Sequence, residues 1–359
     1  MSSPHDPRSE SDIQSSLIIS RKSDHLRLAM DAGSQFAAND GFESWHFEHQ
    51  ALPEIDFDEI NLNCQLFGKS LKAPLLIASM TGGPEQGAKI NQNLAQAAQT
   101  LGLGMGLGSM RVIFDQPETL TTFQVRDVAP DILLLANLGA VQLNKGFSEW
   151  HCREVVKQVQ ADGLYLHLNP LQEAIQPEGD TSFRNLTEHI AEACSQLEFP
   201  VLAKECGNGL SARSAKRLIG AGIQGLEVSG RGGTSWAWIE AQRQTDIRRQ
   251  RLGRTFAHWG LSTPDSLLAC REVANETPLI ASGGIRSGLD MAKALALGAD
   301  AVSIAQPLLK AALESPAAVI QELELFLLEL KITMFCVGAR NLTELKKIPL
   351  HKNQSASQS

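Results

Sequence analysis

The chain has 359 residues, of which 43% are hydrophobic and 20% are charged, and its net charge is −8. This length suits one large α/β barrel with tails, and the composition can fill a sizeable core. The acidic balance counts against nucleic-acid binding. No apolar segment reaches membrane-spanning length, and the first residues, MSSPHDPRSE, lack the apolar stretch of a signal peptide. We therefore expect a soluble, cytoplasmic protein with no membrane partner.

The two ends of the chain are polar, which predicts disordered tails at residues 1–15 and 351–359. A single domain is expected between them, over residues 16–350. The six cysteines are scattered and form no C-x-x-C pair, so we expect reduced thiols rather than a zinc site or a disulfide framework.

Eight short apolar runs alternate with helical patterns along this domain. The predicted strands cover residues 75–79, 103–108, 132–137, 164–169, 201–205, 225–229, 278–284 and 301–306. Helical patterns such as 87–102, 211–222 and 287–299 lie between them, and glycine ends many of these. Strands alternating with helices predict a parallel (β/α)8 TIM barrel with an N-terminal arm and a C-terminal helical extension. An open doubly wound sheet would need a G-x-G-x-x-G turn, which SMTGGPEQG does not provide.

Two further segments extend the barrel pattern. Residues 236–260 form an insertion after the sixth strand, and insertions at that point lie on the catalytic face of a barrel. Residues 323–338 form an apolar helical stretch, for which packing on the barrel is favoured over packing on a neighbouring subunit.

Polar or glycine residues follow seven of the eight predicted strands, where the active sites of such barrels lie. In LYLHLN (164–169) the three leucines share one face, and His167 and Asn169 share the other. The leucine face suits the surrounding helices, so we expect His167 and Asn169 to point into the barrel. The same alternation directs Lys204 and Glu227 inward.

The last two strands are followed by SGGIRSG (282–288) and AQP (305–307). Barrels often bind phosphate at these two loops, and glycines leave backbone N–H groups open to an anion. The pattern favours a phosphate-bearing cofactor over plain turns, and a flavin suits the site best. Lys204 would stabilise negative charge at the flavin N1–C2=O edge; the alternative is an ion pair with Glu205 or Glu227.

Eight motifs in this order resemble the type 2 isopentenyl-diphosphate isomerases: RKSDH (21–25), SMTGG (79–83), GLGSMR (106–111), ANLGA (136–140), LHLNPLQE (166–173), KECGNG (204–209), SGRGGTSW (229–236) and ASGGIRSG (281–288). The resemblance implies an FMN-dependent barrel that interconverts isopentenyl diphosphate and dimethylallyl diphosphate. It also implies Mg²⁺ on the diphosphate, flavin reduced by NADPH, and a homo-oligomer, a tetramer or an octamer.

The resemblance also assigns residues. It implies FMN contacts at Ser79, Met80, Thr81, Ser109, Asn137, Lys204, Ser229 and Thr234, and contacts to the FMN phosphate at Gly283, Gly284, Arg286, Ala305 and Gln306. The implied diphosphate ligands are Arg21, Lys22, Ser109, Arg111, His167, Asn169 and Gln172. Glu173 is the implied Mg²⁺ ligand, and carboxylate oxygen suits that hard cation. Gln172 and Glu240 are the candidate catalytic residues near the substrate carbons.

The nearest rival is an FMN-dependent oxidoreductase of the 2-hydroxy-acid oxidase type. Such enzymes carry a histidine base in an H-G-G-R-type loop after the sixth strand, where this chain has Arg231 in SGRGGTSW. A nucleotide dehydrogenase would need a catalytic cysteine in a flexible loop, and Cys206 follows Lys204 too closely for that role.

Overall fold

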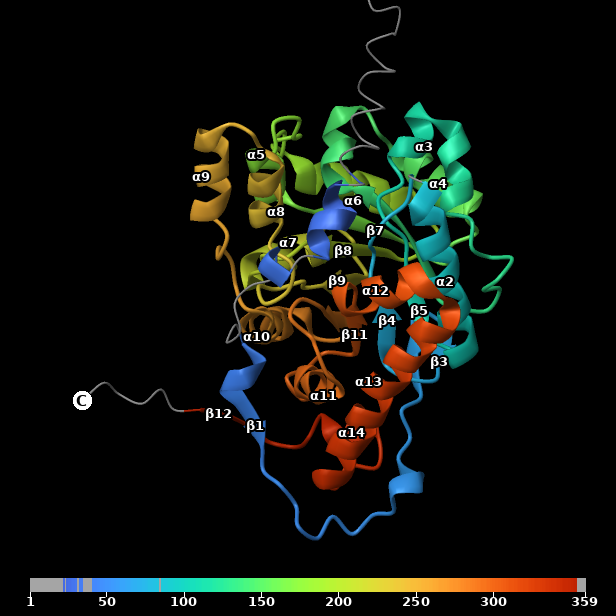
Figure 1. Ribbon diagram of the computed structural model, residues 1–359, viewed down its shortest axis with the longest axis vertical. Coiled ribbons are helices and arrows are strands. Elements are labelled where there is room, and N and C mark those ends of the chain that lie inside the picture. Colours follow the sequence, from blue (N-terminus) through green and yellow to red (C-terminus); the bar gives the residue numbers. More distant parts are fainter. Residues whose placement is uncertain (1–21, 23, 31, 35–40, 84, 354–359) are drawn as a thin grey trace, which may run out of the picture.

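The computed structural model describes residues 22, 24–30, 32–34, 41–83 and 85–353. The eight predicted strands form a closed, all-parallel barrel, and their spatial order follows the sequence (Figure 1). The strands are β4 Leu75–Ile77, β5 Gly104–Gly106, β6 Leu134–Gly139, β7 Gly163–Leu168, β8 Val201–Glu205, β9 Gly225–Glu227, β10 Leu279–Ala281 and β11 Ala301–Ile304. Pairing of the last strand, β11, with the first, β4, closes the ring. The predicted TIM barrel is confirmed.

Helices surround the barrel in the order that the apolar pattern predicts. Those of eight residues or more are α2 Glu85–Leu101, α4 Glu149–Gln158, α6 Leu186–Gln196, α7 Ala212–Gly220, α8 Trp236–Arg243, α9 Ile247–Thr255, α10 Thr263–Ala274, α11 Gly288–Ala296, α12 Gln306–Glu314 and α13 Pro316–Cys336. Shorter helices are α3 Val112–Asp115, α5 Pro170–Ile175 and α14 Leu342–Leu345. Gly102 follows α2 with a φ of 66°, the left-handed conformation that stops a helix.

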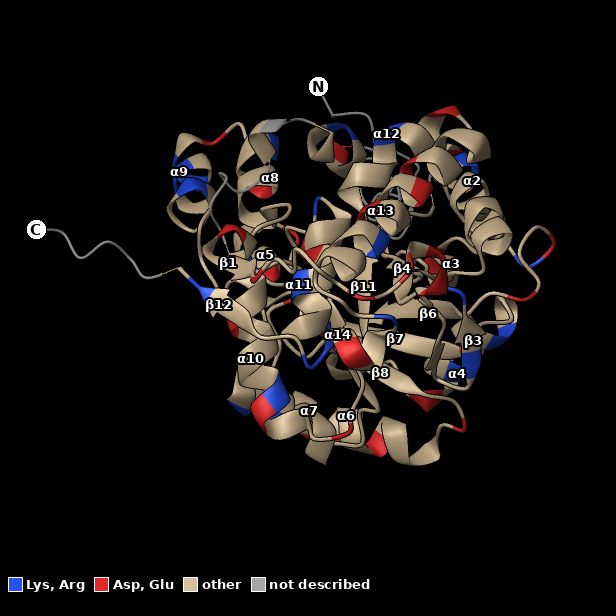
Figure 2. Cartoon of the chain, turned by 90° about the horizontal axis from the view of Figure 1, so that it is seen from below, with Lys and Arg blue, Asp and Glu red and all other residues tan. Residues whose placement is uncertain are grey.

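The core has two parts, as the strand alternation requires. Leu164 and Leu166 face outward into the large cluster between strands and helices, whereas Tyr165 faces the barrel interior. The interior cluster also contains Leu66 and Leu71 from the hairpin of β2 Cys64–Leu66 and β3 Lys69–Leu71. Apolar side chains therefore fill the barrel beneath its polar mouth. Figure 2 shows the charged residues mainly on helices and loops, with the strands mostly tan.

The insertion and the C-terminal extension lie where the sequence predicts. Helices α8 and α9 follow β9, the sixth strand of the barrel, and α8 contacts α5 on the catalytic face. Helix α13 packs against α2, α11 and α12 and buries one face, including Leu323 and Leu330. None of the described helices combines the length and the apolar content needed to cross a membrane.

One predicted boundary is wrong. Residues 351 and 352 belong to β12 Leu350–Lys352, which pairs with β1 Trp45–Phe47, so the C-terminal tail was placed too early. The pairing joins segments about 300 residues apart, and the short polar sequence of β12 gives no local sign of it. The N-terminal tail predicted at 1–15 lies outside the described residues.

Candidate active site

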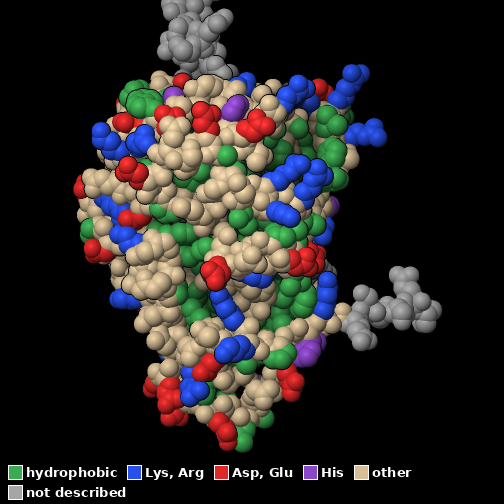
Figure 3. Space-filling view, turned by 180° about the vertical axis from the view of Figure 1, so that it is seen from behind, with side chains coloured by type: hydrophobic (Ala, Val, Ile, Leu, Met, Phe, Trp, Pro, Cys, Tyr) green, Lys and Arg blue, Asp and Glu red, His purple; other side chains and the backbone are tan. Residues whose placement is uncertain are grey.

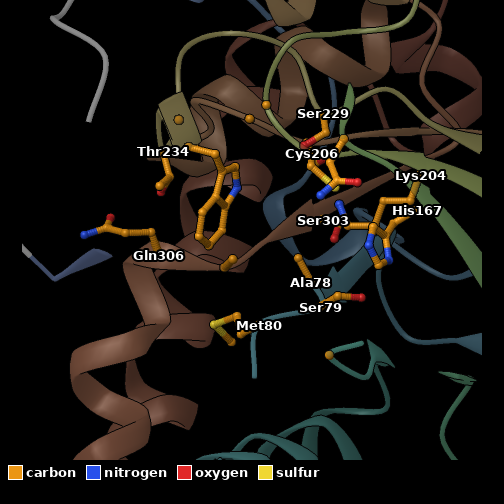
Figure 4. Close-up of a pocket in the computed structure, with 18 of the residues that line it drawn as sticks. Ala78, Ser79, Met80, His167, Lys204, Cys206, Ser229, Thr234, Ser303 and Gln306 are labelled. Carbon is orange, nitrogen blue, oxygen red and sulfur yellow. The ribbon is translucent and has the colours of Figure 1, made fainter. Parts of the chain in front are cut away.

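A polar cavity of about 270 Å³ opens at the carboxyl ends of the barrel strands. It brings together residues that are far apart in sequence, because parallel strands of a closed barrel end at one mouth. Its wall includes these sequence-predicted residues: Lys22, Ser79, Met80, Thr81, Ser109, Arg111, Asn137, His167, Asn169, Gln172, Glu173, Lys204, Ser229, Thr234, Gly283, Gly284, Arg286, Ala305 and Gln306. Figure 4 shows Ser79, His167, Lys204 and Ser229 around a common space, with Met80, Thr234 and Gln306 beyond it.

Of the other two predicted site residues, Arg21 lies outside the described residues. Glu240 is completely buried on α8 and does not line the cavity itself. It contacts the wall residue Gln172, whose Nε2 donates to Glu240 Oε1 at 3.1 Å. Of the two candidate catalytic residues, Gln172 therefore lies on the cavity wall, and Glu240 is buried behind it.

His167 points into the cavity from β7, as the alternation predicts. Its Nδ1 lies 2.8 Å from Asn137 Oδ1, and Asn137 Nδ2 donates to Ser79 Oγ at 3.0 Å. With the amide in this orientation, Nδ1 of His167 carries the donated hydrogen. The contacts join β7, β6 and the segment after β4, and they hold the imidazole ring at the mouth of the barrel.

Lys204 forms a buried ion pair with Glu227, which was the alternative role considered for it from the sequence. Its Nζ lies 2.5 Å from Glu227 Oε1, and the two side chains are 9% and 0% exposed. Burial opposes the charge on Lys204, but the neighbouring Glu227 carboxylate outweighs it and raises the pKa of Lys204. Lys204 stays cationic at the cavity wall, so the ion pair and a contact to an anionic ligand are compatible.

The loops after β9 and β10 line the cavity and pack backbone against backbone. A Cβ at Gly283, where φ is 91°, would stand 2.0 Å from Gly230 O. One at Gly284 would stand 2.8 Å from Gly232 C. Helix α12 begins beside them at Gln306. Pro307 has no N–H and Leu308 N donates to Ala305 O at 3.0 Å, so the Gln306 N–H is the donor that the start of this helix can offer. Glycine is required here because no side chain fits, and the exposed N–H groups suit a phosphate.

Several wall residues carry buried polar atoms without a partner among the described residues: Thr81 Oγ1, Asn169 Oδ1, Ser282 Oγ and Ser303 Oγ. Buried polar groups in proteins are almost always hydrogen-bonded, so each of these calls for an explanation. Because all four atoms belong to residues of the cavity wall, a polar ligand in the cavity would account for them. Together with the glycine loops, they fit a flavin nucleotide.

Glu173 lies on the cavity wall in the first turn of α5, and both of its carboxylate oxygens accept hydrogen bonds. Oε1 accepts from Asn169 Nδ2 at 2.9 Å, and Oε2 accepts from Gln176 Nε2 at 2.7 Å and Asp180 N at 2.6 Å. No group of three His, Cys, Asp or Glu residues that could hold a metal occurs among the described residues. A single carboxylate still fits Mg²⁺, which is often bound by one carboxylate together with substrate phosphates and waters.

Two described residues of the N-terminal arm, Lys22 and His25, line the cavity, and only Lys22 was predicted from the motifs. Lys22 Nζ donates to Gly82 O at 2.6 Å and to Ser109 O at 3.0 Å, which brings this cation to the wall. His25 also lines the cavity, and its Nε2 lies 2.8 Å from Glu240 Oε1. His25 stands in the RKSDH motif, so the signal for it was present.

The network around Glu240 keeps its carboxylate charged. Burial favours the neutral form, but hydrogen bonds from His25 and Gln172 and the charge of Arg243 lower the pKa of Glu240 to about 2. The Arg243 guanidinium lies 2.6 Å from Oε2. Trp236 completes this side of the wall and meets the His25 ring edge-on at 5.1 Å between ring centres. It stands in the SGRGGTSW motif but was not assigned from the sequence.

The two rival enzyme classes each need one particular catalytic residue, and the residues at the corresponding positions of this chain do not suit those roles. Arg231, at the position of the oxidase histidine, is absent from the cavity wall formed by the described residues. Cys206 is on the wall, but burial raises the pKa of its thiol to about 12. A neutral thiol is a poor nucleophile, which counts against the nucleotide-dehydrogenase alternative.

A parallel barrel with a glycine-lined anion site after its last strands defines a class of flavin-binding barrel. Residues 145–352 match the family model described as FMN-dependent dehydrogenase. Relatives similar to this chain are the isopentenyl-diphosphate delta-isomerases of Nostoc sp., 49% identical over 91% of this chain and 94% of the relative, and of Rickettsia felis, 49% identical over 92% and 96%. The chain belongs to the isopentenyl-diphosphate delta-isomerase family, which confirms the resemblance seen in the motifs.

Solved structures show the same fold at much lower identity. A lactate oxidase from Pediococcus acidilactici has a TM-score of 0.66 at 20% identity, covering 96% of this chain and 94% of that one. The (S)-mandelate dehydrogenase from Pseudomonas putida has a TM-score of 0.64 at 21% identity, covering 92% and 99%. At such identity the likeness extends to the barrel alone.

Proposed function

We propose that this protein interconverts isopentenyl diphosphate and dimethylallyl diphosphate by adding a proton at one carbon and removing one from another. One observation carries the proposal: a single cavity holds two anion-binding ends. The glycine loops and α12 suit the phosphate of a cofactor. Lys22, Arg111 and His167 gather with Glu173 elsewhere on the same wall and suit a metal-bound diphosphate.

The cofactor in this proposal is FMN. Its phosphate would be held by Gly283, Gly284, Arg286, Ala305 and Gln306, and its ring by Ser79, Met80, Thr81, Ser109, Asn137, Lys204, Ser229 and Thr234. Reduced FMN, when bound, supplies the acid and base for the double-bond shift. Lys204, kept cationic by Glu227, would stabilise negative charge on the ring.

The diphosphate end uses this chain's own cations and amides. Arg21 and Lys22 from the arm, with Ser109, Arg111, His167, Asn169 and Gln172, would bind phosphate oxygens, and Glu173 would hold Mg²⁺. A carboxylate with a pKa of about 2 remains ionised at neutral pH. In this proposal Glu240 therefore accepts hydrogen bonds and orients Gln172 beside the substrate carbons.

The remaining parts of the proposal concern reductant, surroundings and assembly. We propose NADPH as the reductant, a cytoplasmic location and a homo-oligomer, tetramer or octamer, without nucleic-acid or membrane partners. The outward-facing Leu325, Leu328 and Ile332 of α13 support self-association. Basic and acidic side chains are interspersed over most of the face in Figure 3, which supports the absence of a nucleic-acid partner.

The test uses the FMN-loaded protein, photoreduced without oxygen and mixed with isopentenyl diphosphate and Mg²⁺. We expect dimethylallyl diphosphate to form while the flavin stays reduced. Turnover of 2-hydroxy acids in air, without any isomerisation, would refute the proposal in favour of the oxidase alternative. Omission of Mg²⁺ is the internal control for the metal.

A further inference from the structure

Asp180 joins several residues of the diphosphate end, although no sequence motif singles it out. It lies in the loop between α5 and α6. Its Oδ2 accepts from Arg111 Nη1 at 2.9 Å and from Gln142 Nε2 at 3.1 Å, and its Oδ1 lies 3.1 Å from Lys145 Nζ. Arg111 and Gln142 both line the cavity. One carboxylate thus holds two wall residues that come from different βα loops.

The backbone of the same residue holds the proposed metal ligand. Asp180 N donates to Glu173 Oε2 at 2.6 Å. The close approach depends on Gly179, where a Cβ would stand 1.8 Å from Glu173 O. A side chain there would push the loop away from α5, so the sequence of the loop is suited to this contact.

The contacts of the Asp180 carboxylate indicate a positional role. It lies between the Arg111 guanidinium at 2.9 Å and the Lys145 ammonium at 3.1 Å, and both cations favour its charged form. A fixed negative charge beside a diphosphate site weakens anion binding by repulsion. That cost is offset if the carboxylate fixes the Arg111 guanidinium, whose fork of five donors can bind Asp180 and an anion together.

We propose that Asp180 is a positioning residue for the diphosphate and its metal ion: its carboxylate aims Arg111 and Gln142 into the cavity, and its amide orients Glu173. The inference rests on the proposed function, because that function makes Arg111 and Glu173 ligands. Partners of metal ligands typically change metal affinity 10- to 100-fold when they are replaced. The effect should therefore appear in binding rather than in the proton transfer.

The experiment measures binding of inorganic diphosphate with Mg²⁺ to the FMN-loaded protein by calorimetry. We expect Asp180→Asn, which keeps the size and the backbone N–H but removes the charge, to weaken binding about 10-fold. KM for isopentenyl diphosphate and the Mg²⁺ requirement should rise together, whereas kcat should change less than about threefold. Flavin retention reports folding; if Asp180→Asn loses flavin, Asp180→Glu takes its place with the same expected loss.

Asp162 is a matched control at the other end of the barrel. Its carboxylate also meets an arginine, a lysine and a backbone N–H: Arg126 at 2.7 Å, Lys69 at 3.1 Å and Leu134 N at 2.8 Å. Asp162→Asn should lower stability but leave diphosphate affinity unchanged.

Unchanged affinity in the Asp180 variant, or an equal loss in Asp162→Asn, would overturn the inference. So would a wild-type protein that binds no diphosphate. A wild type that binds diphosphate with Mg²⁺ but does not isomerise would refute only the proposed reaction, because this binding assay needs no turnover.

Discussion

Replacement of Lys204 by methionine tests the energetic role of the ion pair beneath the cavity. The change leaves Glu227 completely buried, with its Oε1 deprived of the partner at 2.5 Å and Oε2 already without a partner among the described residues. Breaking a buried pair from one side costs about 3–5 kcal/mol. At about 2–4 °C per kcal/mol for a large domain, Lys204→Met should lower Tm by roughly 6–20 °C.

The opposite single change should be milder. Glu227→Gln leaves Lys204 on the cavity wall with its side chain 9% exposed, and Glu205 O remains 3.3 Å from its Nζ. The double variant should be more stable than Lys204→Met alone by about 2 kcal/mol, because no unpaired carboxylate remains. This ordering follows from the different exposure of the two partners.

The assay is urea and thermal unfolding of flavin-free protein, so that lost cofactor contacts do not enter. Equal losses in Lys204→Met and in the double variant would refute the reasoning, since the penalty would then come from packing rather than from the stranded charge. Separate titration with FMN measures the flavin contact; unchanged affinity in Lys204→Met would refute the proposed role at the ring.

Three further changes probe the cavity. Glu173→Gln should raise the Mg²⁺ concentration needed for diphosphate binding about 10-fold in calorimetry, and an equal loss of FMN would show that this carboxylate is misplaced. Gly283→Ala should release FMN on dialysis, because its Cβ would meet Gly230 O at 2.0 Å, whereas Gly220→Ala, with open space around it, should not. The pKa of Glu240 is about 2 in the folded protein, against 4.5 for a free glutamate. Its ionised carboxylate therefore stabilises the fold by about 3 kcal/mol above pH 4.5, and this stabilisation is lost as the pH falls toward 2. The Tm difference between wild type and Glu240→Gln should shrink over that range; a constant difference would contradict this account.

Short-range sequence patterns predicted the barrel and the polar strand ends at its mouth, and the family resemblance assigned most individual residues there. The alternation around His167 has a period of two residues, so the leucines that must face the helices fix the direction of the polar side chains. The role of Gly283 and Gly284 in a tight loop could also be predicted from the sequence, since a loop whose backbone conformation and close packing admit no side chain requires glycine. Once eight strands are known to be parallel and closed, their carboxyl ends must meet, and the residues after them must share one cavity.

The tertiary structure alone determined the contacts between residues that share no local sequence pattern. His25 meets Glu240 across 215 positions, β1 pairs with β12 across about 300 positions, and Asp180 accepts hydrogen bonds from the βα loops after β5 and β6. A polar side chain in a loop carries no periodicity that would indicate its direction. Its partner is set only when barrel closure brings distant segments together. Most of the cavity wall could therefore be predicted from sequence, whereas the network that holds the wall in place could not.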